Sequence, residues 1–284
     1  MLFALKNHNK AFTLVELLVV IAIVGLLSTI VLAVTSGVSE QGRIAKSLQF
    51  SKHLENALGS NLAGRWNLDE GTGVTARDSS GWNNNGVITG AIYTNDTPSD
   101  YGYALDFDGL DYVQIANHNS LVLDSAITVE AWVNARSLSG NTTNQYRIIN
   151  KFSYPNNGWY LRYHNSFIFS TYDGSGHNAS YSITPTLNTW HHVVGVSDGT
   201  NNLVYVDGVS GNSVETGVLT NSSSVLETSS SSGDYDWNGF IDEVKIYSVA
   251  LTASQIKSQY LVGLNELLIK GLITEQEHLK RLAL

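Results

Sequence analysis

The chain begins with a long apolar segment and continues with short runs in which apolar and polar residues alternate. No charged residue and no proline interrupts the stretch from Leu17 to Val34. At about 1.5 Å per residue, this stretch would form a helix of about 27 Å, close to the roughly 30 Å hydrocarbon core of a bilayer. The pattern predicts a membrane-spanning helix over residues 14–34.

The stretch that follows the apolar segment is amphipathic. Apolar residues recur among charged ones at a spacing typical of a helix, at Ile44, Leu48, Leu54 and Leu58. We expect one long N-terminal helix over residues 12–61, which ends at Gly59-Ser60-Asn61. The amphipathic second half is expected to pack onto the globular domain of the same chain.

From residue 62 to about 250 the pattern changes to short alternating runs separated by Gly, Asn and Asp. No long helical pattern separates these runs, which favours an antiparallel sandwich over a parallel sheet. Together with the segments on either side, the pattern predicts a long N-terminal α-helix, an all-β antiparallel sandwich and a short C-terminal helical tail. The predicted strands include Tyr103–Phe107, Tyr112–Ile115, Ile127–Ala135, Tyr146–Lys151, Trp159–Tyr163, Phe167–Tyr172, Trp190–Val196, Leu203–Val206 and Phe240–Tyr247.

Two of these runs allow a sharper prediction. The residues from Ile127 to Val133 alternate, yet both faces of the strand carry large apolar groups, so we expect an inner strand covered on both sides. Asp207-Gly208 is predicted to be a two-residue hairpin turn, because both residues tolerate the positive φ that a type I′ turn requires. Trp66, Trp132 and Trp190 fall within predicted strands and should belong to the core.

Residues 251–284 are predicted to be helical. Thr252 and Thr274 each begin a capping-box pattern, Thr-x-x-Gln and Thr-x-x-Glu. The first helix should run to about Val262, with Gly263 as an interruption before a second helical stretch over residues 264–270. The tail is interpreted either as an appendage that packs against protein or as a solvated helical hairpin.

The start of the chain resembles a known signal. Ala11-Phe12-Thr13-Leu14-Val15-Glu16-Leu17-Leu18 is similar to the cleavage and methylation signature of type IV prepilins and of type II secretion pseudopilins. This resemblance implies that a prepilin peptidase removes the leader, residues 1–11, and that Phe12 becomes the N-methylated first residue. Glu16 would then pair with the α-amino group of a neighbouring subunit. Ala11 stands where the family usually has glycine.

Two other interpretations of the apolar segment remain open. It could be an ordinary signal anchor that is not cut, or a secretory signal peptide, although such peptides have shorter apolar cores of about 7–15 residues. In each case Lys6 and Lys10 keep the leader in the cytoplasm and place the head outside it. The pilin interpretation implies a single-pass protein of a bacterial inner membrane that later enters an extracellular pilus or a periplasmic pseudopilus.

The body of the chain carries a second resemblance, which spans residues 62–262. Its ordered segments are similar to the laminin-G-like jelly rolls of the concanavalin A-like lectin and glucanase architecture. The matching segments are Trp66–Gly73, Asp78–Gly86, Ala104–Gly109, Ile127–Val133, Trp190–Val194, Val204–Gly208 and Asn238–Tyr247. The resemblance implies a structural Ca²⁺ between the first loop and the last strand, with Asp78, Asn83 and Asp242 as ligands. The alternative is an Asx-turn at Asp78 and a hydrogen-bonded acid at Asp242.

The composition, the net charge and the spacing of carboxylates argue against several classes of function. The chain has no cysteine, which excludes disulfides and thiolate metal sites. Its formal net charge is −9, and removal of the two leader lysines would take it to −11, which argues against nonspecific nucleic-acid binding. The Glu-x-Asp-x-x-Glu spacing of glucanases of this architecture is absent, and adjacent Asp242 and Glu243 would point to opposite faces of a strand. We therefore predict a protein that is not an enzyme.

Binding is the remaining class of function. Loops rich in aromatic, Asn, Asp and Gly residues are typical of sugar sites, and two such loops contain the candidate ligand-binding residues Tyr154, Trp159, Tyr172, His177 and Asn178. The alternative is ordinary hairpin loops with a buried Trp159. The sequence predicts a pilin-like subunit that assembles with itself and other pilin-like subunits and displays its head for adhesion or glycan recognition. The rival hypotheses are a membrane-anchored carbohydrate-binding protein and a purely structural fibre subunit.

Overall fold

The chain divides into two compact units, Met1–Leu48 and Gln49–Leu284. The computed structural model describes residues 42, 49, 56–98, 102–139, 143–153, 157–216, 219–220, 222–231 and 235–284. The predictions made at Ala11, Phe12, Glu16 and the membrane span at 14–34 therefore lie outside the described residues. Within the part that is described, no helix is long and apolar enough to cross a membrane.

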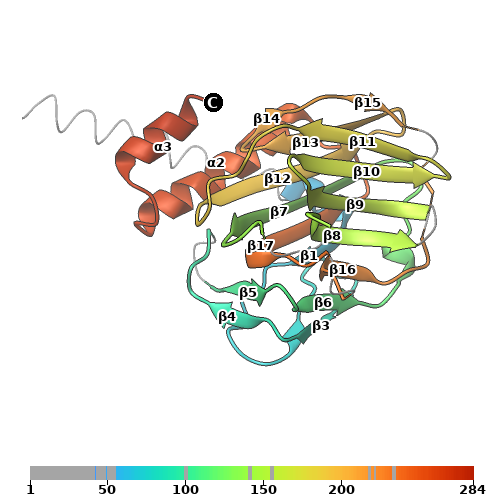
Figure 1. Ribbon diagram of the computed structural model, residues 1–284, viewed down its shortest axis with the longest axis horizontal. Coiled ribbons are helices and arrows are strands. Elements are labelled where there is room, and N and C mark those ends of the chain that lie inside the picture. The colour runs from blue at the N-terminus through green and yellow to red at the C-terminus, as the bar shows by residue number, and fades with distance from the viewer. Residues whose placement is uncertain are drawn as a thin grey trace, which may run out of the picture. The chain divides into compact units, whose positions relative to one another are not determined.

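The second unit is a sandwich of two antiparallel sheets (Figure 1). As far as the described residues show, one sheet has nine strands and the other has eight. The nine-stranded sheet runs in the order β14 (Val209–Ser210), β13 (Asn201–Val206), β12 (Trp190–Ser197), β7 (Ile127–Ala135), β17 (Asn238–Tyr247), β5 (Ala104–Asp108) and β4 (Ile92–Thr94), with β1 (Leu62–Trp66) paired to β17 and β15 (Val214–Glu215) paired to β13.

The eight-stranded sheet begins at the edge strand β11 and ends at β2. Its order is β11 (Gly176–Tyr181), β10 (Phe167–Asp173), β9 (Asn157–Tyr163), β8 (Tyr146–Ser153), β16 (Leu226–Ser229), β6 (Tyr112–Ile115), β3 (Gly86–Thr89) and β2 (Thr75–Ala76). Short 3₁₀ turns lie at Gly59–Asn61 (η1) and Asn119–Leu121 (η2). Residues 56–58 are helical and η1 directly follows them, so the helical segment ends where the sequence predicted.

The alternation pattern located the strands well. The predicted strands at Tyr112–Ile115 and Ile127–Ala135 are confirmed residue for residue, and the other seven differ by one or two residues at an end. All nine residues of β7 are buried, as expected for an inner strand covered on both sides. Its inner face contacts the sandwich core, and its outer face carries Trp132, which packs against a helix.

The space between the sheets is filled by large apolar side chains from both. Several of its largest side chains are aromatic: Trp66, Phe107, Trp159, Phe167, Phe169 and Trp237 are all at most 3% exposed. The predicted turn after β13 is also present: Asp207 has φ 53° and Gly208 has φ 77°, as a type I′ hairpin turn requires. This turn connects β13 to β14.

The C-terminal residues form two helices, α2 (Ala253–Ile269) and α3 (Glu275–Leu282). The capping box at Thr252 is confirmed, because its side chain accepts a hydrogen bond from the Gln255 amide while Gln255 accepts one from the Thr252 amide. The predicted interruption at Gly263 was wrong: α2 runs through it without a break. Figure 1 shows both helices beside β12 and β14, away from β8 to β11.

These helices cover the outer face of the nine-stranded sheet. Tyr260, Leu264 and Leu267 of α2 form a buried cluster with Trp132 of β7 and Trp190 of β12. A Cβ on Gly263 would lie 2.2 Å from a ring carbon of Trp132, so glycine allows the helix to approach the sheet closely. The tail is therefore a packed part of the head, which excludes the solvated-hairpin interpretation.

Candidate functional site

The outer face of the eight-stranded sheet is the surface that the helices leave uncovered. In β9 the side chains of Trp159, Leu161 and Tyr163 point into the core, so Tyr160 and Arg162 between them point outward. The same alternation in β10 turns Ser170 and Tyr172 outward. The neighbouring strands continue this row of outward residues with Arg147, Asn150 and Phe152 of β8, Asn178 of β11 and Glu227 of β16.

Two arginines stack on aromatic rings at the centre of this face. The guanidinium carbon of Arg162 lies 4.7 Å from the centroid of the Tyr160 ring. That of Arg147 lies 4.4 Å from the Tyr235 ring and 5.8 Å from the Tyr160 ring. Such cation–π contacts hold a guanidinium flat against a ring while its edge N–H groups stay available. Burial lowers the pKa of Arg147, and the neighbouring Tyr235 and Tyr160 act in the opposite direction.

A second group of aromatic residues adjoins the arginines. The hydroxyls of Tyr160 and Tyr172 are 2.7 Å apart, and Phe152 packs edge-on against both rings at centroid distances of 5.8 and 4.8 Å. Tyr160 is buried, whereas Phe152 and Tyr172 are half-buried. Burial, followed by the hydrogen bond to Tyr160, raises the pKa of Tyr172, so its hydroxyl stays protonated at neutral pH.

Amide and hydroxyl groups surround these rings. The Asn150 amide donates to the Ser229 carbonyl at 2.9 Å, and Ser170 donates to the Asn178 side chain. Aromatic rings next to fixed amides and hydroxyls are the composition that sugar sites use, since the rings cover apolar sugar faces and the polar groups orient the hydroxyls. Asn150 and Ser170 are buried, so the groups of this set that a ligand could reach are the half-buried Phe152 and Tyr172 and the exposed Asn178.

The structure divides the predicted ligand-binding residues. Tyr172 and Asn178 lie on this face, and Tyr154 lies outside the described residues. The expectation for Trp159 is corrected: it is 3% exposed and belongs to the core, so its ring is not available to a ligand. His177 is held at the edge of the sheet by Asp173 at 3.0 Å and by the Glu215 carbonyl at 3.2 Å.

Sequence reasoning missed Arg147, Tyr160 and Arg162. The signal was available in part, because the alternation of the predicted strands at 146–151 and 159–163 turns these residues away from the apolar side. The fact that they lie next to one another depends on the register between β8 and β9. That register is a tertiary property.

The three predicted calcium ligands do not form one group. The carboxylate of Asp78 accepts hydrogen bonds from three backbone amides. Its Oδ1 accepts from the amides of Arg65 and Ser80 at 3.0 and 2.9 Å, and its Oδ2 accepts from the Asn84 amide at 2.8 Å. Asn83 has φ 62°, and its side chain accepts a hydrogen bond from Asn85. No hydrogen bond or ion pair joins either residue to Asp242.

Asp242 has a different environment. It is fully buried in β17, where it accepts hydrogen bonds from the Thr97 hydroxyl and from the Glu243 amide. Burial raises the pKa of Asp242 well above its ordinary range, and the negative charges of Glu243 and Asp69 raise it further. Among the residues that the structure describes, no three His, Asp or Glu side chains gather as a metal-binding group. The donor set predicted from the sequence does not fit a single ion.

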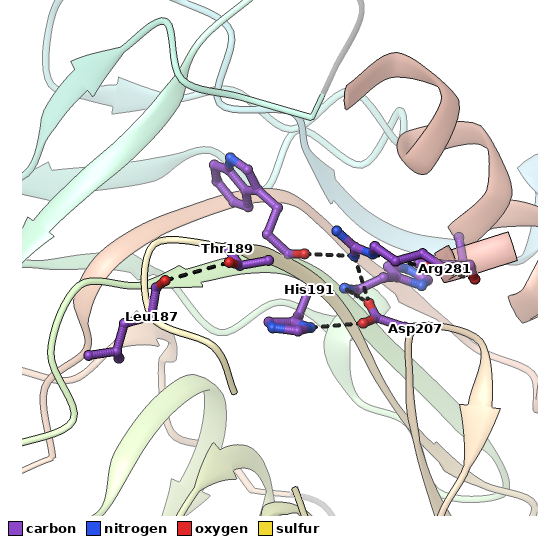
Figure 2. Close-up of polar contacts among 8 residues, drawn as sticks. Leu187, Thr189, His191, Asp207 and Arg281 are labelled. Atoms are coloured by element: carbon purple, nitrogen blue, oxygen red, sulfur yellow. Dashed lines mark hydrogen bonds and ion pairs between the residues drawn. The ribbon is translucent and has the colours of Figure 1, made fainter. Parts of the chain in front are cut away.

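A further polar cluster joins helix α3 to the sandwich (Figure 2). Arg281 reaches from α3 to Asp207 in the β13–β14 turn, with 3.3 Å between Nη2 and Oδ1, and donates to the Trp190 carbonyl at 2.8 Å. His191 contacts the other oxygen of Asp207 at 2.8 Å, and the His192 amide donates to Oδ1 at 3.0 Å.

This cluster is structural. Burial of Asp207 raises the pKa of its carboxyl, but the hydrogen bond from His191 and the charge of Arg281 outweigh burial and leave the pKa below its ordinary value. Its carboxylate has three polar partners, so it locks α3 onto the hairpin. As Figure 2 shows, Leu187 and Thr189 are joined separately, through the Leu187 carbonyl and the Thr189 hydroxyl at 3.5 Å.

The family model of the concanavalin A-like lectin/glucanases superfamily matches residues 107–257, more than half of the 284-residue chain. The chain belongs to this superfamily. Residues 6–32 match the model of the prokaryotic N-terminal methylation motif, which confirms the pilin-like resemblance of the N-terminal segment. No curated protein sequence matches the whole chain significantly.

Several solved structures have a fold similar to that of the head. The binding domain of Paraclostridial Mosquitocidal Protein 1 aligns with a TM-score of 0.59 at 18% identity, over 73% of this chain and 53% of that one. Domain 4 of AbnA, a GH43 extracellular arabinanase from Geobacillus stearothermophilus solved with arabinotriose, aligns with a TM-score of 0.57 at 21% identity, over 69% and 97%.

A third similar structure is the botulinum neurotoxin serotype D ligand-binding domain, solved with N-acetylneuraminic acid. It has a TM-score of 0.57 and 16% identity, over 73% of this chain and 52% of that one. The chain thus spans about half the length of the two toxin domains. Identities at this level establish the shared jelly-roll fold. One chain therefore contains both a pilin-like N-terminal motif and a head of the concanavalin A-like superfamily.

Proposed function

We propose that this protein is a type IV pilin-like or pseudopilin subunit whose jelly-roll head recognises glycans or other surface polymers. One observation carries the proposal: a methylation motif at residues 6–32 precedes a head of the lectin superfamily in the same chain. The motif supports assembly through the N-terminal helix. The head supplies a surface that a fibre would present to its surroundings.

The open face of the eight-stranded sheet supports the recognition part of this proposal. It carries aromatic rings and fixed amides, and helices α2 and α3 lie against the other sheet. Similar domains were solved with arabinotriose and with N-acetylneuraminic acid, both of which are sugars. A binding head of this kind needs no catalytic carboxylate pair, so we propose that the protein is not an enzyme.

Assembly is tested on the full chain, co-expressed with a prepilin peptidase and the machinery of a type IV pilus or type II secretion system. Mass spectrometry of the mature protein should find methylated Phe12 as the first residue. Glu16→Ala should reduce incorporation into filaments strongly, whereas the matched change Glu40→Ala should not, because only Glu16 would face a buried amine. A chain that keeps its first eleven residues would instead be a membrane-anchored module.

Recognition is tested with the full-length protein in detergent on a glycan array. Binding of any glycan class at micromolar concentration supports the adhesive role. A head that binds no glycan or surface polymer would leave the structural fibre subunit as the better hypothesis. The array separates these two functions whatever the outcome for Glu16.

The calcium ion predicted from the laminin-G-like resemblance is a separate proposal. If Ca²⁺ binds the folded head, the melting temperature must rise with Ca²⁺ concentration by mass action. The three residues named from the sequence would not hold it together, because Asp78 accepts hydrogen bonds from backbone amides and Asp242 is buried against Thr97 and Glu243. A melting temperature that does not change between EDTA and millimolar Ca²⁺ would contradict the proposal.

A further inference from the structure

Two arginines face each other across neighbouring strands on the open face. In the antiparallel register of β8 and β9, Arg147 is paired directly with Arg162. Like charges in directly opposite positions destabilise a sheet. Such a pair therefore costs the folded protein free energy unless another group compensates for it.

The protein itself compensates only in part. Within the described residues, the guanidinium groups donate to neutral side-chain oxygens, Arg147 to Asn150 at 3.5 Å and Arg162 to Gln145. The Nε of Arg162 is buried and has no hydrogen-bond partner there. Neither arginine forms a salt bridge with a described carboxylate, although the chain has 25 acidic residues and a net charge of −9.

The carboxylate of this face that acts electrostatically on Arg147 is Glu227. It is directed elsewhere: its Oε1 accepts from Ser231 at 2.6 Å and from Gln114 at 3.3 Å. The register places Glu227 opposite Asn150 and Gln114 rather than opposite an arginine. The positive charge of the Arg147–Arg162 pair therefore remains available on a surface of an acidic protein.

We propose that the Arg147–Arg162 pair binds the carboxylate of an acidic sugar, so that the head prefers glycans that contain uronic or sialic-type residues. This inference rests on the proposed glycan recognition and specifies its substrate class. A guanidinium offers two parallel N–H groups that match a carboxylate, and a bound anion would relieve the repulsion between the two arginines. The half-buried rings of Tyr172, Phe152 and Tyr235 lie beside the pair and would cover the apolar face of the sugar.

The test compares acidic ligands with neutral ligands of the same shape. The full-length protein in detergent is titrated with polygalacturonate oligomers and with their methyl esters, and with sialyllactose and with lactose. At least one acid should bind about tenfold more tightly than its neutral partner, which corresponds to ~1.4 kcal/mol. The preference should shrink as salt is raised, because exposed charges are screened within roughly 8–10 Å at physiological ionic strength.

Matched variants assign the preference to residues. Arg147→Gln and Arg162→Gln should each lower the affinity for the acid to that for its neutral partner and leave binding of the neutral sugar nearly unchanged. Arg162→Lys should lose most of the preference, because lysine keeps the charge but lacks the planar fork. Arg77→Gln removes the same charge from an exposed position directly after β2 and should change nothing.

The outcomes separate this inference from the proposed function. Equal affinity for acids and their neutral partners, or an equal effect of Arg77→Gln, would overturn the acidic-sugar assignment while the glycan-binding function stands. A preference for a sulfated galactan over every carboxylated ligand would overturn the carboxylate assignment. If no sugar of either kind binds, the inference fails, and the glycan array decides whether the adhesive function stands. The comparison of wild-type affinities needs no variant, so misfolding of a mutant cannot hide the result.

Discussion

The two outer faces of the sandwich differ in whether helices cover their aromatic and charged side chains. Both sheets turn aromatic and charged side chains away from the core. On the nine-stranded sheet these are Trp132, Trp190 and His192, and the C-terminal helices cover them. On the eight-stranded sheet they are Arg147, Tyr160 and Arg162, and no described helix covers them.

The difference lies in how the charges are partnered. On the covered face Arg281 meets Asp207, and Lys245 lies 3.2 Å from Glu130 and 3.1 Å from Glu243. On the open face Arg147 is paired with Arg162 across neighbouring strands. A covered surface must neutralise its charges internally because burial of an unpaired charge is costly, whereas an open surface can keep them for a ligand. Substitutions on the two faces should therefore differ in size and even in sign.

The largest effect is expected for Arg281→Met. Loss of one member of a buried ion pair leaves the other charge uncompensated and typically costs about 3–5 kcal/mol. Arg281 is 4% exposed, and its substitution removes the link from α3 to Asp207 and to the Trp190 carbonyl. Urea denaturation measures the loss. Lys280→Met is the matched control. Lys280 is the neighbouring residue and its side chain is 77% exposed, so its substitution should change the free energy of unfolding little.

A pair of substitutions sharpens this result. Arg281→Met combined with Asp207→Asn should be less destabilising than the sum of the two single changes, because the double variant leaves no unpaired charge. Strict additivity would show that the ion pair does not hold α3 in place.

Gly263→Ala should have the next largest effect, and here the sign is decisive. In an exposed helix this change stabilises by roughly 0.8–1 kcal/mol. At this position the new Cβ would lie 2.2 Å from the Trp132 ring, and overpacking of this kind costs about 1–3 kcal/mol. We expect a net loss in the thermal unfolding temperature. A gain would mean that α2 does not pack closely against β7.

Acid should weaken the covered face to a smaller extent. The pKa of Asp207 is lowered in the folded protein, so the unfolded chain binds a proton first as the pH falls. Its contribution to stability is complete above the unfolded pKa of about 3.9 and is lost as the pH falls through the folded pKa. Asp242, whose pKa is raised, acts in the opposite direction.

The contribution of Asp207 is isolated by a difference between variants. The free energy of unfolding should fall more steeply from pH 6 to pH 3 in the wild type than in Asp207→Asn. Parallel curves would show that Asp207 has the same pKa in the folded and unfolded states.

The smallest effect is expected for Arg147→Gln on the open face. The change removes cation–π contacts with Tyr235 and Tyr160, worth roughly 0.5–1 kcal/mol, and it also removes the repulsion with Arg162. The two terms oppose each other, so stability should change by less than about 1 kcal/mol. Thermal and urea unfolding measure it. A loss of several kcal/mol would show that the open face is as structural as the covered one.

Local sequence patterns were enough to predict the type of many segments. Alternation located strands such as Ile127–Ala135, the Asp207-Gly208 pair specified a type I′ turn, and Thr252 marked the start of a helix. These features depend on neighbours within a few residues, where steric limits and side-chain period act directly. The methylation motif was readable for the same reason, since its residues are contiguous.

The tertiary structure decided which of these segments meet. Gly263 was expected to break a helix, but it is the point at which that helix fits against Trp132. Trp159 was a candidate contact for a ligand, but the strand parity turned it into the core. Arg147 and Arg162 are 15 positions apart, and the register of β8 with β9 pairs them. Arg281 and Asp207 are 74 positions apart, and the docking of α3 brings them together. Local sequence carries no information about such contacts, because they depend on how whole elements pack.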